Sequence, residues 1–209
     1  TFIPEEAVGQ YQIISGENKT EIQFDIPQDS LTFLATKDVD NQSISFQGVV
    51  MENAQSGILY HGVGVNGSST QQYLRAQAYG KQMADLDANL VIVSFGTNDC
   101  YMQSSRFCVD CVKERFRKLI VEIRRENPSV AILLTSPPDS YLFRKYANNN
   151  LPKLQNAMKE LCFEQNVALW DFYAIMGGKY SIKKWYADGL ARRDYVHLTR
   201  AGYELQGNL

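Results

Sequence analysis

The sequence predicts an α/β fold, a three-layer α/β/α sandwich with a flavodoxin-like parallel sheet, preceded by a small all-β segment. Three observations predict it. Polar and apolar residues alternate within the first fifty or so positions, continuous apolar runs of strand length recur after them, and stretches with helical periodicity separate those runs.

The all-β segment comes first. Residues 21–26, 31–34 and 44–50 alternate between polar and apolar side chains, as half-buried antiparallel strands do. Polar turn clusters separate them at residues 15–18 and 38–42. No helical stripe occurs before about residue 70. We therefore assign residues 1–56 to part of a β-rich module.

Strands and helices alternate in the remainder, residues 57–209. Apolar, strand-like runs occupy residues 58–65, 90–95, 130–134 and 167–170, and helical patterns occupy residues 71–83, 111–126 and 151–165. This alternation is typical of a parallel sheet with helices on both faces. Such sheets bind ligands at the carboxyl ends of their strands, so functional residues are expected just after Val65, Phe95, Leu134 and Trp170.

Composition excludes several function classes. The 209 residues contain 21 Lys and Arg against 23 Asp and Glu, a formal net charge of −2, and no basic run indicates a nucleic-acid or anionic-membrane partner. The apolar runs are far shorter than the ~20 residues of a membrane span. The chain opens on Thr1 without a signal-like segment, so we expect a piece of a longer protein, with any targeting segment upstream.

The four cysteines leave two alternatives open. The spacing of Cys108 and Cys111 is that of redox and zinc sites, but a structural zinc ion needs a second ligand pair. The two histidines, His61 and His197, are far apart in sequence, and His61 lies on a strand-like run typical of a structural residue. A helix-borne thiol pair or a local disulfide is preferred, and no metal is expected. The partners of Cys100 and Cys162 are left open.

Three short motifs carry side chains suited to acyl transfer. Gly64-Val-Asn-Gly67 follows the first apolar run, Gly96-Thr-Asn98-Asp99 follows the second, and Asp194-Tyr-Val-His197 lies near the end. Each also has a structural interpretation. Gly67 suits a turn, Asn98 or Asp99 suits a helix cap, and His197 suits an anchor for a last helix capped by Thr199. We assign capping to Asp99 and hydrogen-bond donation to Asn98, because the order of the motifs favours catalysis.

In this order, the motifs resemble blocks II, III and V of the SGNH (GDSL-type) ester hydrolases. The resemblance covers residues 57–209. Residues 135–140 and 170–178 are similar to a Bacteroidales-type subgroup of secreted acylhydrolases, in which a β module is inserted between blocks I and II. It implies an exported serine esterase, periplasmic or on the cell surface, without metal or cofactor. The implied substrate is a small-molecule or carbohydrate ester, such as an O-acetyl group.

The resemblance and the chemistry assign the same roles. Gly67 offers a backbone N–H, and Asn98 a side-chain amide, to the oxyanion of a tetrahedral intermediate. His197 acts as the general base, and Asp194 accepts from its other ring nitrogen and fixes the tautomer.

Block I, the Gly-Asp-Ser that supplies the nucleophile, is missing. The near match is Gln28-Asp29-Ser30, but it lacks the Gly, follows an alternating strand and precedes further strands instead of a helix. Ser68 and Ser69 beside Gly67 are weaker alternatives. We expect the nucleophile upstream of Thr1 and this chain to be almost inactive alone. The rival hypothesis is a non-catalytic carbohydrate- or partner-binding protein on a decayed hydrolase scaffold.

Overall fold

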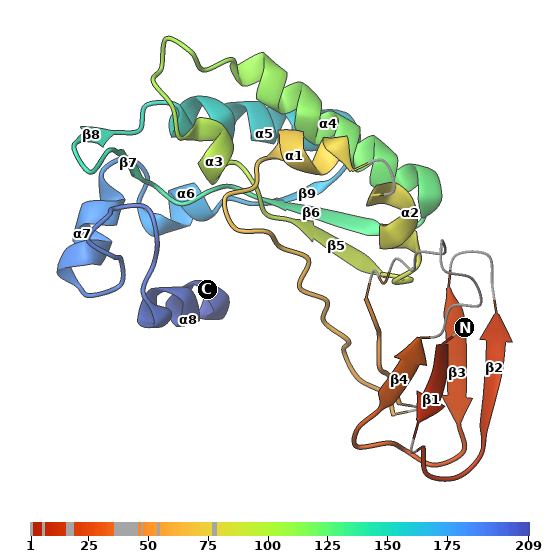
Figure 1. The fold of residues 1–209 in the computed structure, drawn as a ribbon. Coiled ribbons are helices and arrows are strands. Elements are labelled where there is room, and N and C mark those ends of the chain that lie inside the picture. Colours follow the sequence, from red (N-terminus) through yellow and green to blue (C-terminus); the bar gives the residue numbers. More distant parts are fainter. Residues whose placement is uncertain are drawn as a thin grey trace. The chain divides into compact units, whose positions relative to one another are not determined.

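The computed structural model describes residues 2–5, 7–15, 19–35, 46, 48–53, 55–76 and 79–209. The chain divides into two units, Thr1–Val63 and Gly64–Leu209, each with its own internal contacts (Figure 1). The division falls a few residues after the boundary at 56/57 that the sequence suggests. The assignment of residues 57–209 to a hydrolase domain stays a prediction.

The first unit contains two antiparallel strand pairs. Strand β1 (Phe2–Glu5) pairs with β4 (Thr32–Ala35), and β2 (Tyr11–Ser15) pairs with β3 (Thr20–Phe24). The predicted strands at 21–26 and 31–34 are thus confirmed. The strand predicted at 44–50 lies partly outside the described residues.

The second unit is built on a parallel sheet, as predicted. Strands β5 (Leu90–Val93), β6 (Ala131–Thr135) and β9 (Ala168–Trp170) lie in the order β5-β6-β9, each parallel to its neighbour. The fold class, α/β with a parallel sheet after a small all-β segment, is confirmed.

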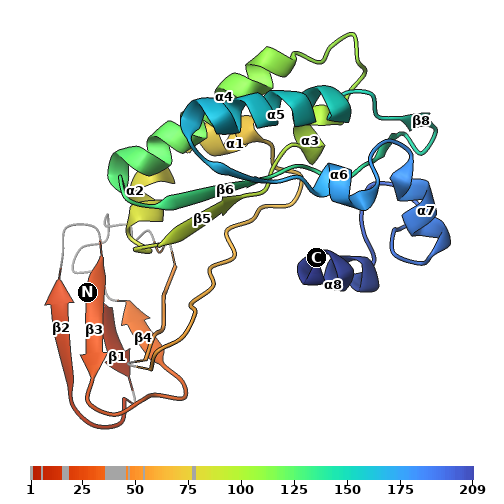
Figure 2. The ribbon, with the colours of Figure 1, turned by 180° about the vertical axis from the view of Figure 1, so that it is seen from behind.

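Four helices cover one face of this sheet, as the views from the front and from behind both show (Figures 1 and 2). They are α1 (Thr70–Arg75), α2 (Tyr79–Ala84), α4 (Val109–Glu126) and α5 (Leu151–Gln165). The predicted helix at 71–83 is therefore two helices, and α1 ends at Ala76, which has an extended backbone. The buried side chains of the strands meet α4 and α5: Val91, Val93, Ile132 and Leu134. On the other face of β5, Leu90 and Ile92 are each 50% exposed.

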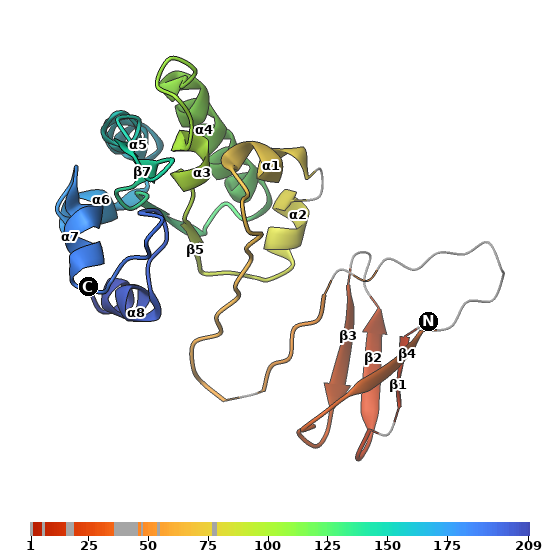
Figure 3. The same cartoon turned by 60° about the vertical axis from the view of Figure 1, so that its left-hand side comes forward.

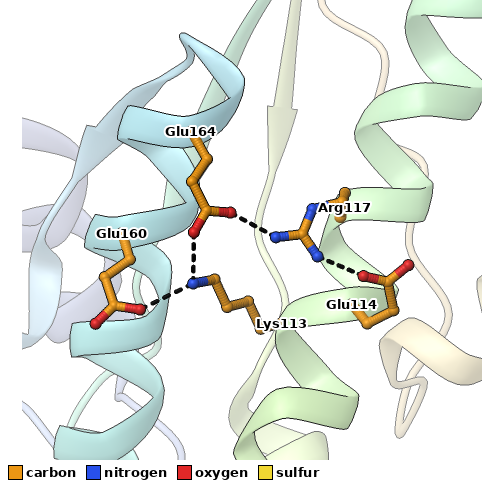
Figure 4. A network of polar contacts seen from close by, with 5 residues as sticks. All are labelled: Lys113, Glu114, Arg117, Glu160 and Glu164. Carbon is orange, nitrogen blue, oxygen red and sulfur yellow. Dashed lines mark hydrogen bonds and ion pairs between the residues drawn. The ribbon is translucent and has the colours of Figure 1, made fainter.

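Ion pairs join the outer surfaces of α4 and α5 (Figure 4). Lys113 Nζ lies 2.8 Å from both Glu160 and Glu164, and Arg117 pairs with Glu114 and Glu164. The described residues include no helix long and apolar enough to cross a membrane.

A second, smaller core lies beside the sheet. It packs the hairpin β7 (Tyr141–Leu142) and β8 (Tyr146–Ala147) with α6 (Phe172–Met176) and α7 (Ser181–Ala187). The buried members from these helices are Phe172, Met176, Ile182 and Trp185. Residues 188–199 then lead into α8 (Arg200–Asn208), and α6, α7 and α8 lie at the same end of this unit (Figure 3). Of these short elements, only the last helix, α8, was expected from the sequence.

The strand predicted at residues 58–65 is wrong. No strand is assigned there, and Ile58 is 98% exposed. An apolar run becomes a strand only where a neighbouring strand accepts its backbone hydrogen bonds, and no described strand does so here.

Candidate active site

The loop after β5 is shaped by a glycine that no other residue can replace without strain. Gly96 has φ +114°, and a Cβ there would lie 2.8 Å from Leu154 Cδ2 and 3.1 Å from Pro137 Cγ. This backbone conformation favours glycine. Gly96 is the N-cap of α3 (Thr97–Cys100), so the tight turn brings Asn98 to the carboxyl end of β5.

Asn98 is bonded to the loop that carries Gly67. Its Nδ2 donates to the Ser68 carbonyl oxygen at 2.9 Å. Gly67 lies in a turn at φ +77°, which Ser68 N closes by donating to Val65 O at 3.1 Å. Within the described part of the chain the Gly67 N–H has no acceptor, and the second hydrogen of the Asn98 amide is also free. The structure thus brings the two predicted oxyanion donors together.

The sequence suggested that Asp99 caps the helix that follows it, but the structure shows that it does not. It is buried inside α3, where its carboxylate accepts from Thr70 Oγ1 at 2.6 Å and Thr70 N at 3.2 Å. Arg115 Nη1 lies 3.5 Å from the same carboxylate. The N-cap of α3 is Gly96, which has a left-handed backbone. Glycine has no side chain that could accept a hydrogen bond from the first turn of this helix. Asp99 instead fixes the start of α1, and with it the Gly67 loop.

His197 and Asp194 form the second pair. His197 Nδ1 lies 2.9 Å from Asp194 Oδ2, and Asp194 Oδ1 accepts from the backbone amides of Val196 (2.9 Å) and His197 (3.0 Å). Since an ionised carboxylate can only accept, Nδ1 carries the hydrogen and Nε2 presents its lone pair. The His197 side chain is 63% exposed. The predicted pairing of Asp194 with His197 is therefore present.

These contacts keep Asp194 ionised. Partial burial alone would raise its pKa, but the hydrogen bonds from the backbone and ring of His197 and from Val196 outweigh it and lower the pKa. The carboxylate is thus negative at neutral pH, where it can stabilise a protonated imidazole.

The backbone on each side of His197 is fixed. Arg192 N donates to His197 O at 2.8 Å, and Ala191 and Leu198 form an antiparallel bridge. Thr199 caps α8, because its Oγ1 accepts from Gly202 N at 3.2 Å, which confirms the predicted N-cap.

The segment after β6 is bonded to residues that lie close in sequence to both pairs of site residues. Tyr141 N donates to Tyr195 O at 2.9 Å, next to Asp194. Asn148 and Asn150 each donate from Nδ2 to Cys100 O, at 3.2 and 3.0 Å, two residues after Asn98. Among the described residues no hydrogen bond joins Asn98 to His197 directly. Their convergence on one cleft stays a prediction.

A partly buried polar network at the ends of β6 and β9 was not found from the sequence. Ser136, just after β6, donates to Asp171 Oδ1 at 3.0 Å and accepts from Tyr173 N at 2.9 Å. Partial burial raises the pKa of Asp171, but bonds from Lys159, Gln155 and others lower it overall. The only signal was the similarity of residues 135–140 and 170–178 to a hydrolase subgroup, which did not indicate these bonds.

Asp139 is a second buried carboxyl. It is fully buried and accepts from Ile182 N, at the start of α7, at 3.1 Å. Its other oxygen and the Tyr173 hydroxyl have no hydrogen-bond partner in the described structure. Burial raises the pKa of Asp139 to about 6, against the lowering effect of backbone hydrogen bonds.

The candidate serines differ from a hydrolase nucleophile. Ser30 is exposed in the loop between β3 and β4, and a strand follows it. The neighbouring Gln28 side chain accepts from Val8 N at 2.9 Å and donates to Val8 O at 2.8 Å. Ser69 is the N-cap of α1 in a capping box with Gln72.

The cysteines resolve into a disulfide and two buried thiols. Cys108 and Cys111 are joined, and Cys108 is the N-cap of α4, where its Sγ accepts from Cys111 N. Cys100 and Cys162 are free, and burial raises the pKa of both thiols. No group of three metal-ligating side chains occurs in the part of the chain that the structure describes.

The family of the chain is shown by one of the comparisons with known proteins. The GDSL-like Lipase/Acylhydrolase family matches residues 29–205. No curated protein matches the chain. A peptidoglycan O-acetylesterase structure is similar over 68% of this chain and 43% of its own, with 24% identity and a TM-score of 0.62. This chain therefore spans less than half of that enzyme.

Two further solved structures share the fold. An acetyl xylan esterase matches with 19% identity and a TM-score of 0.55, over 70% of this chain and 76% of its own. A GDSL-like lipase from Bacteroides thetaiotaomicron matches with 18% identity and a TM-score of 0.53, over 68% and 69%.

Proposed function

The chain belongs to the GDSL-like lipase/acylhydrolase family, and we propose that it is the base- and oxyanion-bearing part of a serine ester hydrolase. The observation that carries the proposal is the His197–Asp194 pair. Nδ1 is held at 2.9 Å by a carboxylate, and Nε2 is exposed and free to take a proton. Family membership supports ester hydrolysis in general; the roles of these residues are our proposal.

The reaction follows from these groups. A serine hydroxyl attacks the ester carbonyl while His197 Nε2 removes its proton, and Asp194 stabilises the imidazolium. The negative charge on the carbonyl oxygen accepts hydrogen bonds from Gly67 N–H and the free Asn98 amide hydrogen. His197 returns the proton to the leaving alcohol, and water then cleaves the acyl-enzyme by the same route.

We place the nucleophile in a segment outside this chain, upstream of Thr1. Two observations support this. Ser30 lies between antiparallel strands without a helix after it, whereas a nucleophile elbow joins a strand to a helix. Leu90 and Ile92 of β5 are half exposed, and parallel strands are normally covered on both faces. The rival is Ser30 itself, because the family match begins at Asp29.

The proposed substrate is an O-acetyl ester on a carbohydrate, hydrolysed outside the cytoplasm. Two solved relatives are described as esterases of peptidoglycan and of acetyl xylan, which supports the carbohydrate class. The Cys108–Cys111 disulfide supports an oxidising compartment, such as the periplasm or cell surface. The mechanism uses no metal or cofactor.

Fluorophosphonate labelling tests the nucleophile, and aryl-acetate hydrolysis tests the reaction. The 209-residue chain should neither label nor turn over substrate, whereas a version extended upstream should do both. In the extended protein, His197→Ala or Asn98→Ala should each lower kcat by about 10²–10⁴-fold. Labelling of the present chain that Ser30→Ala abolishes would overturn the placement. An extended protein that neither labels nor hydrolyses esters would favour a binding protein.

A further inference from the structure

Exposed cations occur on three segments that contacts link to the loop of His197. They come from the tip of the β7–β8 hairpin, from α7 and the residues before it, and from the loop after α7. The members are Arg144, Lys145, Lys179, Lys183, Arg192 and Arg193, all exposed. We call these six residues the cationic patch.

Side-chain contacts through Tyr141 join these segments. Lys183 Nζ of α7 lies 4.8 Å from the centre of the Tyr141 ring in the hairpin. The Tyr141 and Tyr195 rings are 5.7 Å apart, and Tyr141 N donates to Tyr195 O. Arg192 N in turn donates to the carbonyl of His197. The segments that carry the patch are therefore linked to the loop of the proposed catalytic base.

The patch residues lack the ion pairs that the same molecule makes elsewhere. On α4 and α5, Lys113 and Arg117 are each bonded to two glutamates (Figure 4). None of the six patch residues has an ion-pair partner among the described residues. Residues 141–147 and 179–193 contain one acidic residue, Asp188, and Asp194 follows directly. Neighbouring unpaired cations repel one another, so an anionic partner would stabilise them.

Exposed aromatic rings lie among the cations. Phe143 at the hairpin tip is 61% exposed, and Tyr146 and Tyr180 are also exposed. Phe143 and Arg144 have φ values of +54° and +62°, which are costly for residues other than glycine. The tip is held by Phe143 N, which donates to Tyr101 Oη at 3.1 Å. Flat apolar faces beside cations suit a partner with both rings and negative charges.

We propose that the ester substrate is an anionic polysaccharide. Its carboxylates pair with the cationic patch, and its sugar rings lie against Phe143 and Tyr146. The proposal rests on the proposed ester hydrolysis and names the substrate class. A nucleic acid would also offer rings and charge, but it carries no carboxylic ester for His197 to act on, whereas an acetylated polysaccharide does.

Binding by the 209-residue chain tests the proposal without a nucleophile. Polygalacturonate, a uronate polymer, and neutral xylan serve as probes in affinity electrophoresis at about 50 and 200 mM salt. We expect polygalacturonate to bind more tightly than xylan. Its binding should weaken as salt is added, because salt screens exposed charge pairs. The double variant Arg144→Gln/Lys145→Gln should bind about tenfold more weakly at low salt, whereas Lys118→Gln on α4 should match the wild type.

Two outcomes would overturn the proposal. One is xylan binding as tightly as polygalacturonate, and the other is single-stranded DNA binding more tightly than either polymer. In the extended, active protein the double variant should lower the ratio of kcat/KM for acetylated polygalacturonate to that for an aryl acetate. An extended protein that hydrolyses aryl acetate with an unchanged ratio refutes the anionic substrate alone. One that hydrolyses nothing refutes the proposed function instead.

Discussion

Replacing Gly202 by Ala should separate α8 from the loop that holds His197. Gly202 lies in the first turn of α8, and a Cβ there would lie 2.0 Å from the Leu190 carbonyl oxygen and 3.1 Å from Leu198 Cβ. The nearer atom belongs to the backbone, so it cannot rotate away. The same oxygen accepts from Thr199 N at 2.9 Å, which ties the loop to the cap of α8.

The size of the effect follows from this geometry. Cβ atoms essentially never approach closer than 3.0 Å, so helix and loop must separate by about 1 Å. Forced packing of one methyl group costs about 1–3 kcal/mol, and loss of the Thr199–Leu190 bond costs about another 1 kcal/mol. The higher helix propensity of Ala than of Gly offsets at most about 1 kcal/mol of this loss. We expect Gly202→Ala to lower the free energy of unfolding by about 2–3 kcal/mol.

Urea denaturation followed by tryptophan fluorescence measures this change. Both tryptophans, Trp170 and Trp185, lie in the second unit, so the signal reports that unit. The matched control is Gly207→Ala in the same helix, because its Cβ would meet nothing within 4 Å. The control should be neutral or slightly stabilising. Equal midpoints for the two variants, at equal slope, would refute the close packing of Gly202 against Leu190.

In the extended, active protein, Asp194→Asn should lower kcat by about 10⁴-fold at pH 7, measured with an aryl acetate, because the amide would favour the wrong tautomer of His197. The pKa of Asp139 is raised from 3.8 to about 6. Its contribution to the free energy of unfolding should therefore be full below about pH 4 and be lost as the pH rises through 6. Urea midpoints of the wild type should fall over this pH range, and those of Asp139→Asn should lack this fall. Reducing the Cys108–Cys111 disulfide, which closes a very short loop, should lower the free energy of unfolding by about 1–2 kcal/mol. Urea midpoints with and without dithiothreitol measure it, and Cys108→Ser/Cys111→Ala should not respond.

Periodicity was enough to predict the elements of the sheet layer. Strands β5, β6 and β9 are runs of apolar residues, and α4 and α5 each bury a stripe of side chains at helical spacing. The small elements could not be found in this way. Helices α6 and α7 are five and seven residues long, too short for a stripe, and their packing around Phe172 and Trp185 is set by tertiary contacts.

The site shows the same division between local and distant contacts. Asp194 and His197 are three residues apart, so their pairing follows from one turn of backbone and was predicted. Asp99 was misassigned because its true partner, Thr70, is 29 positions away in sequence. The sequence shows that a carboxylate suits a nearby cap, but only the fold shows which amide and hydroxyl lie beside it.

The Gly67–Asn98 pair and the Asp194–His197 pair are held by different contacts, and this bears on what the nucleophile proposed upstream of Thr1 would add. Gly67 and Asn98 are fixed by the buried Asp99–Thr70 bonds, whereas His197 is fixed by an exposed loop bonded to Tyr141 through Tyr195. Fixed donors and a fixed base contribute to catalysis because no reorganisation is needed during the reaction. The serine that we propose upstream of Thr1 would need both pairs to converge on one cleft, as predicted, to use them without reorganisation.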